Sequence, residues 1–174
     1  IIECVGSTGN PPEVGLEYYT VGLDKFLNII EKEYLKDYIM QGGSAFKVVL
    51  GAYGGGKTHF LYSIRELAWK HNYVTSYISL TTQFTPLSRL ELVYSAIVRE
   101  LMYSQPIEKI INREHDKGID ALLKSWYAKL YEQFGDSRDD MIDDIERTLE
   151  GGYPSISFRN AIIGAMSALI NERS

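Results

Sequence analysis

The sequence predicts an α/β fold with a parallel sheet core and a helical extension. Two short apolar runs, residues 45–50 and 73–80, have the character of buried parallel strands. A glycine-rich loop follows the first run, and helical periodicity follows the loop and resumes after the second run. The order strand, loop, helix, strand, helix is typical of the beginning of a doubly wound sheet. Beyond Pro106 only helical patterns remain, which predicts the extension.

The helices near the core are predicted from apolar residues that recur every three or four positions. The first begins at Leu23, carries Asp24 at its start, and is ended by Gly42-Gly43. The second follows the glycine loop and ends near His71-Asn72. Its apolar face consists of Phe60, Leu61, Ile64, Leu67 and Ala68. The third begins past Pro86, with Leu90, Val93, Ile97 and Leu101 as its apolar residues.

The extension is predicted to contain helices only, over residues 107–150 and again after a break at Gly151-Gly152-Tyr153-Pro154. The apolar stripe before the break is Leu122, Leu123, Trp126, Leu130 and Phe134. The stripe after it is Ile162, Ile163, Met166, Leu169 and Ile170. Three regions follow from this pattern: a turn-rich lead-in (1–19), an α/β core (20–105) and a helical region (106–174). Because the first residue is not methionine and the last directly follows a helical pattern, we expect a fragment of a longer protein.

Composition narrows the classes of function. The net charge of −5 argues against a chain-wide basic surface for nucleic acid, although DNA contact through other domains stays open. Cys4, the one cysteine, cannot form an internal disulfide, which favours the reducing cytoplasm. No apolar run reaches the roughly 18 residues that cross a bilayer, so no membrane role is expected.

The glycine-rich loop contains the residues that are predicted to bind phosphate. Residues 51–58 read Gly51, Ala52, Tyr53, Gly54, Gly55, Gly56, Lys57 and Thr58, which fits the P-loop pattern G-x-x-x-x-G-K-[ST] in full. Glycines let backbone N–H groups approach phosphate oxygens, and the following helix points its positive end at the same anion. Lys57 supplies a mobile cation for the β and γ phosphates and is the predicted catalytic residue. The Thr58 hydroxyl is a hard oxygen ligand suited to Mg²⁺.

The sequence therefore predicts a P-loop NTPase that binds ATP with Mg²⁺. A glycine-rich turn that binds nothing is the simpler alternative, but the preceding apolar run and the following amphipathic helix argue against it. His59 is predicted at the edge of the nucleotide site, with a structural or solvent-facing role as its alternative. No segment typical of guanine recognition is found, which favours ATP over GTP.

A second marker of such enzymes, an apolar strand ending in Asp or Asp-Glu, is not found. The acidic pairs Asp139-Asp140 and Asp143-Asp144 follow no apolar strand. At helical spacing around Met141, Ile142 and Ile145, they are interpreted as a solvated helix face. Thr81, Thr82 and Gln83 follow the second predicted strand, where they could lie near the γ phosphate or simply form a polar loop.

Several stretches resemble known ATPases. Residues 20–24 lie where AAA+ and origin-recognition ATPases carry a V-G-R segment beside adenine, with Leu23 in place of the arginine. A closer likeness is to the ATP-binding proteins of bacteriophage-exclusion (BREX) defence systems. The stretches that resemble them are residues 19–24, 42–47, 51–61 and 90–94.

The resemblance implies an AAA+-like ATPase module in a multi-domain prokaryotic protein that acts with other defence components. The partners expected for the chain are other proteins or further copies of itself. DNA could be bound through other domains of the larger protein. It adds Val21 and Gly22 to the expected nucleotide contacts. Three functions stay open at this point. The first is ATP hydrolysis that drives conformational work, and the second is a nucleotide-gated scaffold that holds ATP without hydrolysis. A small-molecule kinase ranks below both, because no arginine-rich lid is evident.

Overall fold

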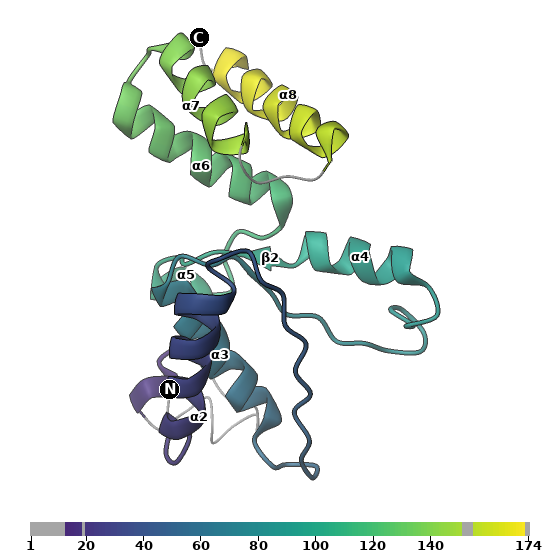
Figure 1. Ribbon diagram of the computed structural model, residues 1–174. Coiled ribbons are helices and arrows are strands. Elements are labelled where there is room, and N and C mark those ends of the chain that lie inside the picture. The colour runs from purple at the N-terminus through teal and green to yellow at the C-terminus, as the bar shows by residue number, and fades with distance from the viewer. Residues whose placement is uncertain (1–12, 19, 151–154, 173–174) are drawn as a thin grey trace. The chain divides into compact units, whose positions relative to one another are not determined.

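The computed structural model describes residues 13–18, 20–150 and 155–172 (Figure 1). The chain divides into two compact units, Ile1–Asp116 and Lys117–Ser174, which are treated separately below. The described residues are mostly helical, and their one sheet has two strands. The lead-in turn at residues 6–12 and the break at 151–154 lie outside the described residues. Among the described residues, no helix has the length and apolar character needed to cross a bilayer.

The first long helix of unit 1 is built from two consecutive segments. It follows the short 3-10 helix η1 (Leu16–Tyr18) and consists of α2 (Asp24–Ile29) and the π-helical η2 (Ile30–Tyr38). Gly42, at a φ of +85°, and the bond from Gly43 N to Tyr38 O (2.9 Å) close its end. A left-handed residue in this place terminates a helix because it turns the chain away from the axis. The helix predicted to run from Leu23 to the two glycines is thereby confirmed.

Helix α3 (Lys57–Lys70) directly follows the glycine loop and lies beside α2 (Figure 1). It ends at His71 and Asn72, as predicted, with Asn72 at a φ of +60° and Tyr73 N donating to Ala68 O (3.0 Å). Its buried face is different from the predicted one. The buried residues are Ser63, Arg65, Ala68 and Trp69.

The rotation of the buried face has a tertiary cause, because residues 13–18 pack on α3. Arg65 donates to Glu13 O (2.6 Å), and Gly15 N donates to Glu66 Oε1 (2.6 Å). The Arg65 guanidinium lies 4.4 Å from the Tyr62 ring centroid and 4.9 Å from that of Trp69. A cation close to aromatic rings and bonded to a carbonyl is stabilised in a buried position. Helical periodicity is judged from apolar residues alone, so it did not predict that the face of α3 with Arg65 is buried.

The core of unit 1 is small and brings together residues distant in sequence. Its buried cluster consists of Val14, Trp69, Met102 and Ile110. Trp69 also donates its Nε1–H to Thr75 Oγ1 (2.9 Å), which satisfies the polar edge of the buried ring. Ile110 belongs to the short helix α5 (Ile107–Ile111). Residues 13–18, interpreted from sequence as lead-in, therefore contribute to the core.

The parallel sheet predicted for unit 1 is not found among the described residues. Of the run 73–80 only β1 (Thr75–Ser76) is a strand, and it pairs antiparallel with β2 (Leu101–Met102). Helix α4 (Leu90–Arg99) confirms the third predicted helix but ends before Leu101, which lies in β2 instead. The predicted sheet is wrong for these residues because a strand requires hydrogen-bonded neighbours, and apolar composition does not supply them.

The run at residues 45–50 is extended but belongs to no sheet within the described residues. Phe46, Val48 and Leu50 alternate along it and are 88%, 65% and 89% exposed. The Nζ of Lys47, between Phe46 and Val48, lies 4.4 Å from the centroid of the Tyr34 ring. The predicted burial of this run is wrong in this structure, because all of its residues are exposed.

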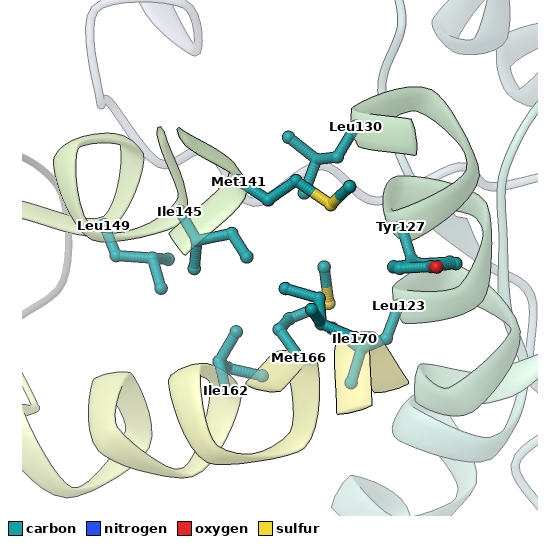
Figure 2. Packing of buried hydrophobic residues seen from close by; sticks show 9 residues of the cluster. All are labelled: Leu123, Tyr127, Leu130, Met141, Ile145, Leu149, Ile162, Met166 and Ile170. Atoms are coloured by element: carbon teal, nitrogen blue, oxygen red, sulfur yellow. The ribbon is translucent and has the colours of Figure 1, made fainter. Parts of the chain in front are cut away.

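Unit 2 is a three-helix bundle in which each helix contacts the other two. Its helices are α6 (Gly118–Phe134), α7 (Arg138–Glu150) and α8 (Ile156–Glu172). Figure 2 shows how their buried side chains point toward one another: Leu123, Tyr127, Leu130, Met141, Ile145, Leu149, Ile162, Met166 and Ile170. The helices predicted for this region are confirmed, and so is the stripe of α8. On α6 the predicted stripe is confirmed except at Leu122, which is not part of the cluster, and Tyr127 is buried in addition. Spacings of three and four residues place each stripe on one helix face.

The acidic pairs of α7 lie on the solvent side of this bundle. Asp139, Asp140 and Asp143 are exposed, and Asp144 accepts a hydrogen bond from Arg147 one turn later. The buried face of the helix is formed by Met141, Ile145 and Leu149. The interpretation of the acidic pairs as a solvated helix face is thereby confirmed.

Candidate functional site

The loop Gly51–Thr58 connects the extended segment 45–50 to α3 and is open to solvent. Residues 51–56 are all exposed, and Tyr53 is fully so. Gly55 N donates to Ala52 O (3.1 Å), which closes a turn inside the loop. The loop has no covering segment among the described residues, since its exposure is continuous. A charged, water-soluble ligand would therefore have direct access to it.

Glycine is required in this loop by backbone geometry. Gly54 and Gly56 have φ angles of +76° and +77°, in the left-handed region that other residues rarely adopt. A Cβ on Gly55 would lie 3.0 Å from Ala52 O, which is tighter than a normal contact. Gly56 is also the residue before α3, so the chain turns sharply and then enters the helix at once. The first N–H groups of a helix have no intrahelical acceptors and point toward such a turn.

Replacing Gly54 with alanine is expected to destabilise unit 1 by about 1 kcal/mol, because the left-handed conformation strains a residue with a Cβ. The matched control is Gly164→Ala in α8, where an added Cβ meets nothing within 4 Å. There the same change should stabilise unit 2 by about 0.5–1 kcal/mol, since alanine is the better helix former.

The two tryptophans allow the two effects to be measured separately, because Trp69 lies in unit 1 and Trp126 in unit 2. Urea unfolding is followed by fluorescence, with Trp126→Phe as background for the first unit and Trp69→Phe for the second. Equal effects at both glycines would contradict a special backbone requirement at Gly54.

Lys57 folds back over the loop. Its Nζ donates to Gly51 O (2.9 Å) and to Ala52 O (2.7 Å), and its Cγ lies 3.5 Å from the position of a Cβ on Gly51. The amine is thereby held at the first two residues of the loop, while its backbone begins α3. An ammonium group and a helix N-terminus are thus placed at one turn, and both favour an anion.

Thr58 occupies the second position of α3 and is half-buried. Its predicted role as a metal ligand would require acidic partners. No group of three or more His, Cys, Asp or Glu suited to a metal ion is found among the described residues. An additional ligand would have to come from the nucleotide's phosphates, water or another acidic residue.

The segment around Val21 and Gly22 is linked to the start of α3 by a side-chain hydrogen bond. Thr20 Oγ1 lies 2.9 Å from His59 Nε2 and 2.6 Å from Leu16 O. Val21 is 90% exposed, and Gly22 has a φ of +79° with open space where a Cβ would be. The structure therefore brings these sequence-predicted residues into one region with the loop. The Thr20–His59 contact joins positions 39 residues apart, and no local pattern could have predicted it.

The polar loop after β1 is explained by its own turn. Phe84 N donates to Thr81 Oγ1 (3.1 Å), and Thr81 N donates to Thr85 Oγ1 (2.9 Å). The Thr85 hydroxyl in turn donates to Ser79 O (2.7 Å). Such side-chain to backbone bonds are typical of residues that stabilise turns. This favours the polar-loop interpretation of residues 81–83 over a role at the γ phosphate.

Comparison with known protein families identifies the family of the chain. The family described as "BREX system ATP-binding protein BrxC/D" matches residues 1–153, which includes the loop and all of unit 1. The chain belongs to this family. No curated protein and no solved structure gave a significant match. The likeness to BREX ATP-binding proteins seen in the sequence is therefore confirmed, and it extends well beyond the stretches that first indicated it.

Proposed function

We propose that the loop Gly51–Thr58 of this BREX-family chain binds the triphosphate of ATP as its Mg²⁺ complex. The observation that carries the proposal is the placement of the Lys57 amine at the first two residues of a glycine turn that leads directly into a 14-residue helix. A triphosphate needs concentrated positive charge and N–H donors at close range. This turn offers both and is exposed to solvent.

Each residue of the loop has a separate task in this proposal. Gly54 and Gly56 give the left-handed turns, and Gly55 leaves the space that a Cβ would fill against Ala52 O. Gly51 and Ala52 hold the Lys57 amine through their carbonyls until phosphate oxygens take their place. Tyr53 projects fully into solvent at the top of the turn. Val21 and Gly22 offer an exposed apolar surface and open space for the base.

Mg²⁺ would enter with the nucleotide. The Thr58 hydroxyl would donate one oxygen ligand, and phosphate oxygens and water would provide others. When bound, the ion neutralises phosphate charge and orients the γ phosphate for transfer. The acidic residue that commonly completes such a site is not found in a metal-binding group among the described residues. We therefore assign only Thr58 of this chain to the ion.

We further propose that the chain is the nucleotide-binding module of an AAA+-like P-loop ATPase. In that setting hydrolysis, assisted by Lys57, drives conformational work in a larger cytoplasmic protein of phage defence. The family description supports ATP as the ligand. Protein partners or further copies of the chain would supply the acidic residue that completes the site, and DNA would be contacted by other domains.

A second candidate is a nucleotide-gated scaffold that holds ATP without hydrolysis. The lack of a metal-binding acidic group in the described part of the chain favours it. Release of inorganic phosphate from ATP distinguishes the two functions. Turnover that disappears in Lys57→Ala supports the ATPase, whereas tight binding without turnover in the complete protein supports the scaffold.

The proposal is tested by titrating the chain with ATP, with and without Mg²⁺, and with ADP and GTP for comparison. Thr58→Ala is expected to weaken binding of ATP with Mg²⁺ about tenfold and to leave binding of metal-free ATP nearly unchanged, because only a metal ligand has been removed. Isothermal titration calorimetry measures both affinities directly.

Thr58→Ser is the matched control, since it keeps the hydroxyl and should retain the Mg²⁺ dependence. An equal loss of affinity with and without Mg²⁺ in Thr58→Ala would show that the hydroxyl contacts phosphate or stabilises the loop. Absence of ATP binding by the unmodified chain would refute the proposed function altogether.

A further inference from the structure

The contact between His59 and Thr20 is a hydrogen bond of defined direction. Thr20 has one hydroxyl hydrogen, and its Oγ1 lies 2.6 Å from Leu16 O, an acceptor without hydrogens. That hydrogen is therefore donated to Leu16. The oxygen can then only accept from His59 Nε2 at 2.9 Å. His59 must consequently carry a hydrogen on Nε2, in the neutral or in the protonated ring.

This bond is the outer end of a chain of interactions that begins in the core of unit 1. Leu16 is 1% exposed, and its carbonyl accepts from both the backbone N–H (2.9 Å) and the hydroxyl of Thr20. Thr20 is thereby fixed to a buried residue on one side and to the first turn of α3 on the other. The next two residues, Val21 and Gly22, then project from a fixed point into open space.

The position of His59 along α3 places this bond next to the proposed phosphate-binding residues. Lys57 and Thr58 precede it directly, so the same helical turn holds the phosphate-binding side chains and the anchor of the Thr20–Gly22 segment. We propose that His59 is a positioning residue that holds this segment at a fixed distance from the phosphate loop, so that one rigid framework binds both ends of a nucleoside triphosphate. This inference rests on the proposed function and adds to it a determinant of affinity for the nucleoside part.

The proposal separates two ligands that share a phosphate chain. ATP has a base and ribose, whereas inorganic tripolyphosphate has neither. His59→Ala and Thr20→Val in the whole chain should each weaken ATP binding about three- to tenfold, the range of one lost hydrogen bond. Tripolyphosphate affinity should stay within about twofold in both variants. The double variant should be no weaker than Thr20→Val alone, because Thr20→Val already removes the bond to His59.

Two further variants distinguish positioning from general stability. His59→Gln can still donate an amide N–H toward Thr20 and should recover most of the ATP affinity. His71→Ala is the matched control, because His71 follows the other end of α3 and its Nε2 also makes a 2.9 Å bond, to Glu31 Oε1. That bond and the one from Lys36 lower the pKa of the Glu31 carboxyl, with Lys36 the larger cause. His71→Ala should leave ATP and tripolyphosphate affinities unchanged.

Calorimetry with both ligands gives the result, and Trp69 fluorescence shows that unit 1 stays folded in each variant. Unchanged ATP affinity in His59→Ala would overturn the positioning role. So would an equal loss for ATP and tripolyphosphate, or additive losses in the double variant. In each of these cases the unmodified chain still binds ATP, which leaves the proposed function intact. Failure of the unmodified chain to bind either ligand would instead refute both.

Discussion

Lys57→Ala is expected to abolish measurable ATP binding. The amine is held at the glycine turn by the carbonyls of Gly51 and Ala52, where it would meet the phosphates. A hydrogen bond to a charged group contributes about 1.5–3 kcal/mol, and the lysine would make at least two of them. Their loss corresponds to a decrease in affinity of at least about 100-fold. Calorimetric titration with ATP and Mg²⁺ measures it.

Stability should change little in this variant, since the two bonds of Lys57 are exposed and water can replace them. Lys32→Ala serves as the control, because Lys32 is an exposed lysine of η2 in the same unit. It removes the same charge from the chain and should not change the affinity. Lys57→Met, which keeps the length of the side chain without its charge, should behave like Lys57→Ala. Normal affinity in either Lys57 variant would remove the basis of the proposed function.

Ile145→Ala is expected to cause the largest loss of stability in the chain, about 2–4 kcal/mol in the free energy of unfolding of unit 2. Ile145 is 1% exposed and lies at the centre of the three-helix core (Figure 2). Its removal leaves a cavity between α7 and the other two helices. A domain of this size is stabilised by only several kcal/mol in total, so a large fraction would be lost. Urea unfolding followed by Trp126 fluorescence in the Trp69→Phe background measures the change.

The same substitution at Ile156 is the matched control, because this isoleucine begins α8 and is 77% exposed. The expected change there is within about 0.5 kcal/mol. Similar losses at the two isoleucines would show that the bundle is not packed around Ile145. The Trp69 signal is followed separately in the Trp126→Phe background. A loss in Ile145→Ala that also appears there would show that the two units unfold together.

The glycine loop could be predicted from the sequence because its determinants are local. Gly54 and Gly56 have left-handed φ angles, and Gly55 has no room for a Cβ. Glycine is the residue that accommodates both conditions. Lys57 and Thr58 directly follow the last glycine and are the first two residues of α3. The first turn of this helix fixes their positions. The bond from Lys57 back to the first loop residues needs no distant partner either.

The bundle of unit 2 was predictable for a related reason. A repeat of three to four residues places Met141, Ile145 and Leu149 on one face of α7 whatever surrounds the helix. The core that this face meets consists of equally periodic stripes on α6 and α8. The residues of α7 that periodicity selects are therefore the ones that pack in the core. The other side of α7 is left to face solvent.

Unit 1 shows where such reasoning fails. Residues 45–50 have the composition of a buried strand, yet Phe46 and Leu50 are almost fully exposed. Residues 73–80 contribute two residues to a sheet, and their partner is the antiparallel strand Leu101–Met102. Strand formation depends on a hydrogen-bonded neighbour from elsewhere in the chain or outside it. The burial of Arg65 on α3 likewise depends on residues 13–18, far away in sequence.

The sequence by itself determined the glycine loop, the limits of the helix that follows it and the periodic faces of the C-terminal bundle. These features arise from interactions within a few residues, where residue type and spacing are sufficient. Only the tertiary structure decided which strand pairs with which, which face of α3 is buried, and that His59 reaches Thr20. These features join segments distant in sequence, and their free energy depends on partners that no local pattern specifies.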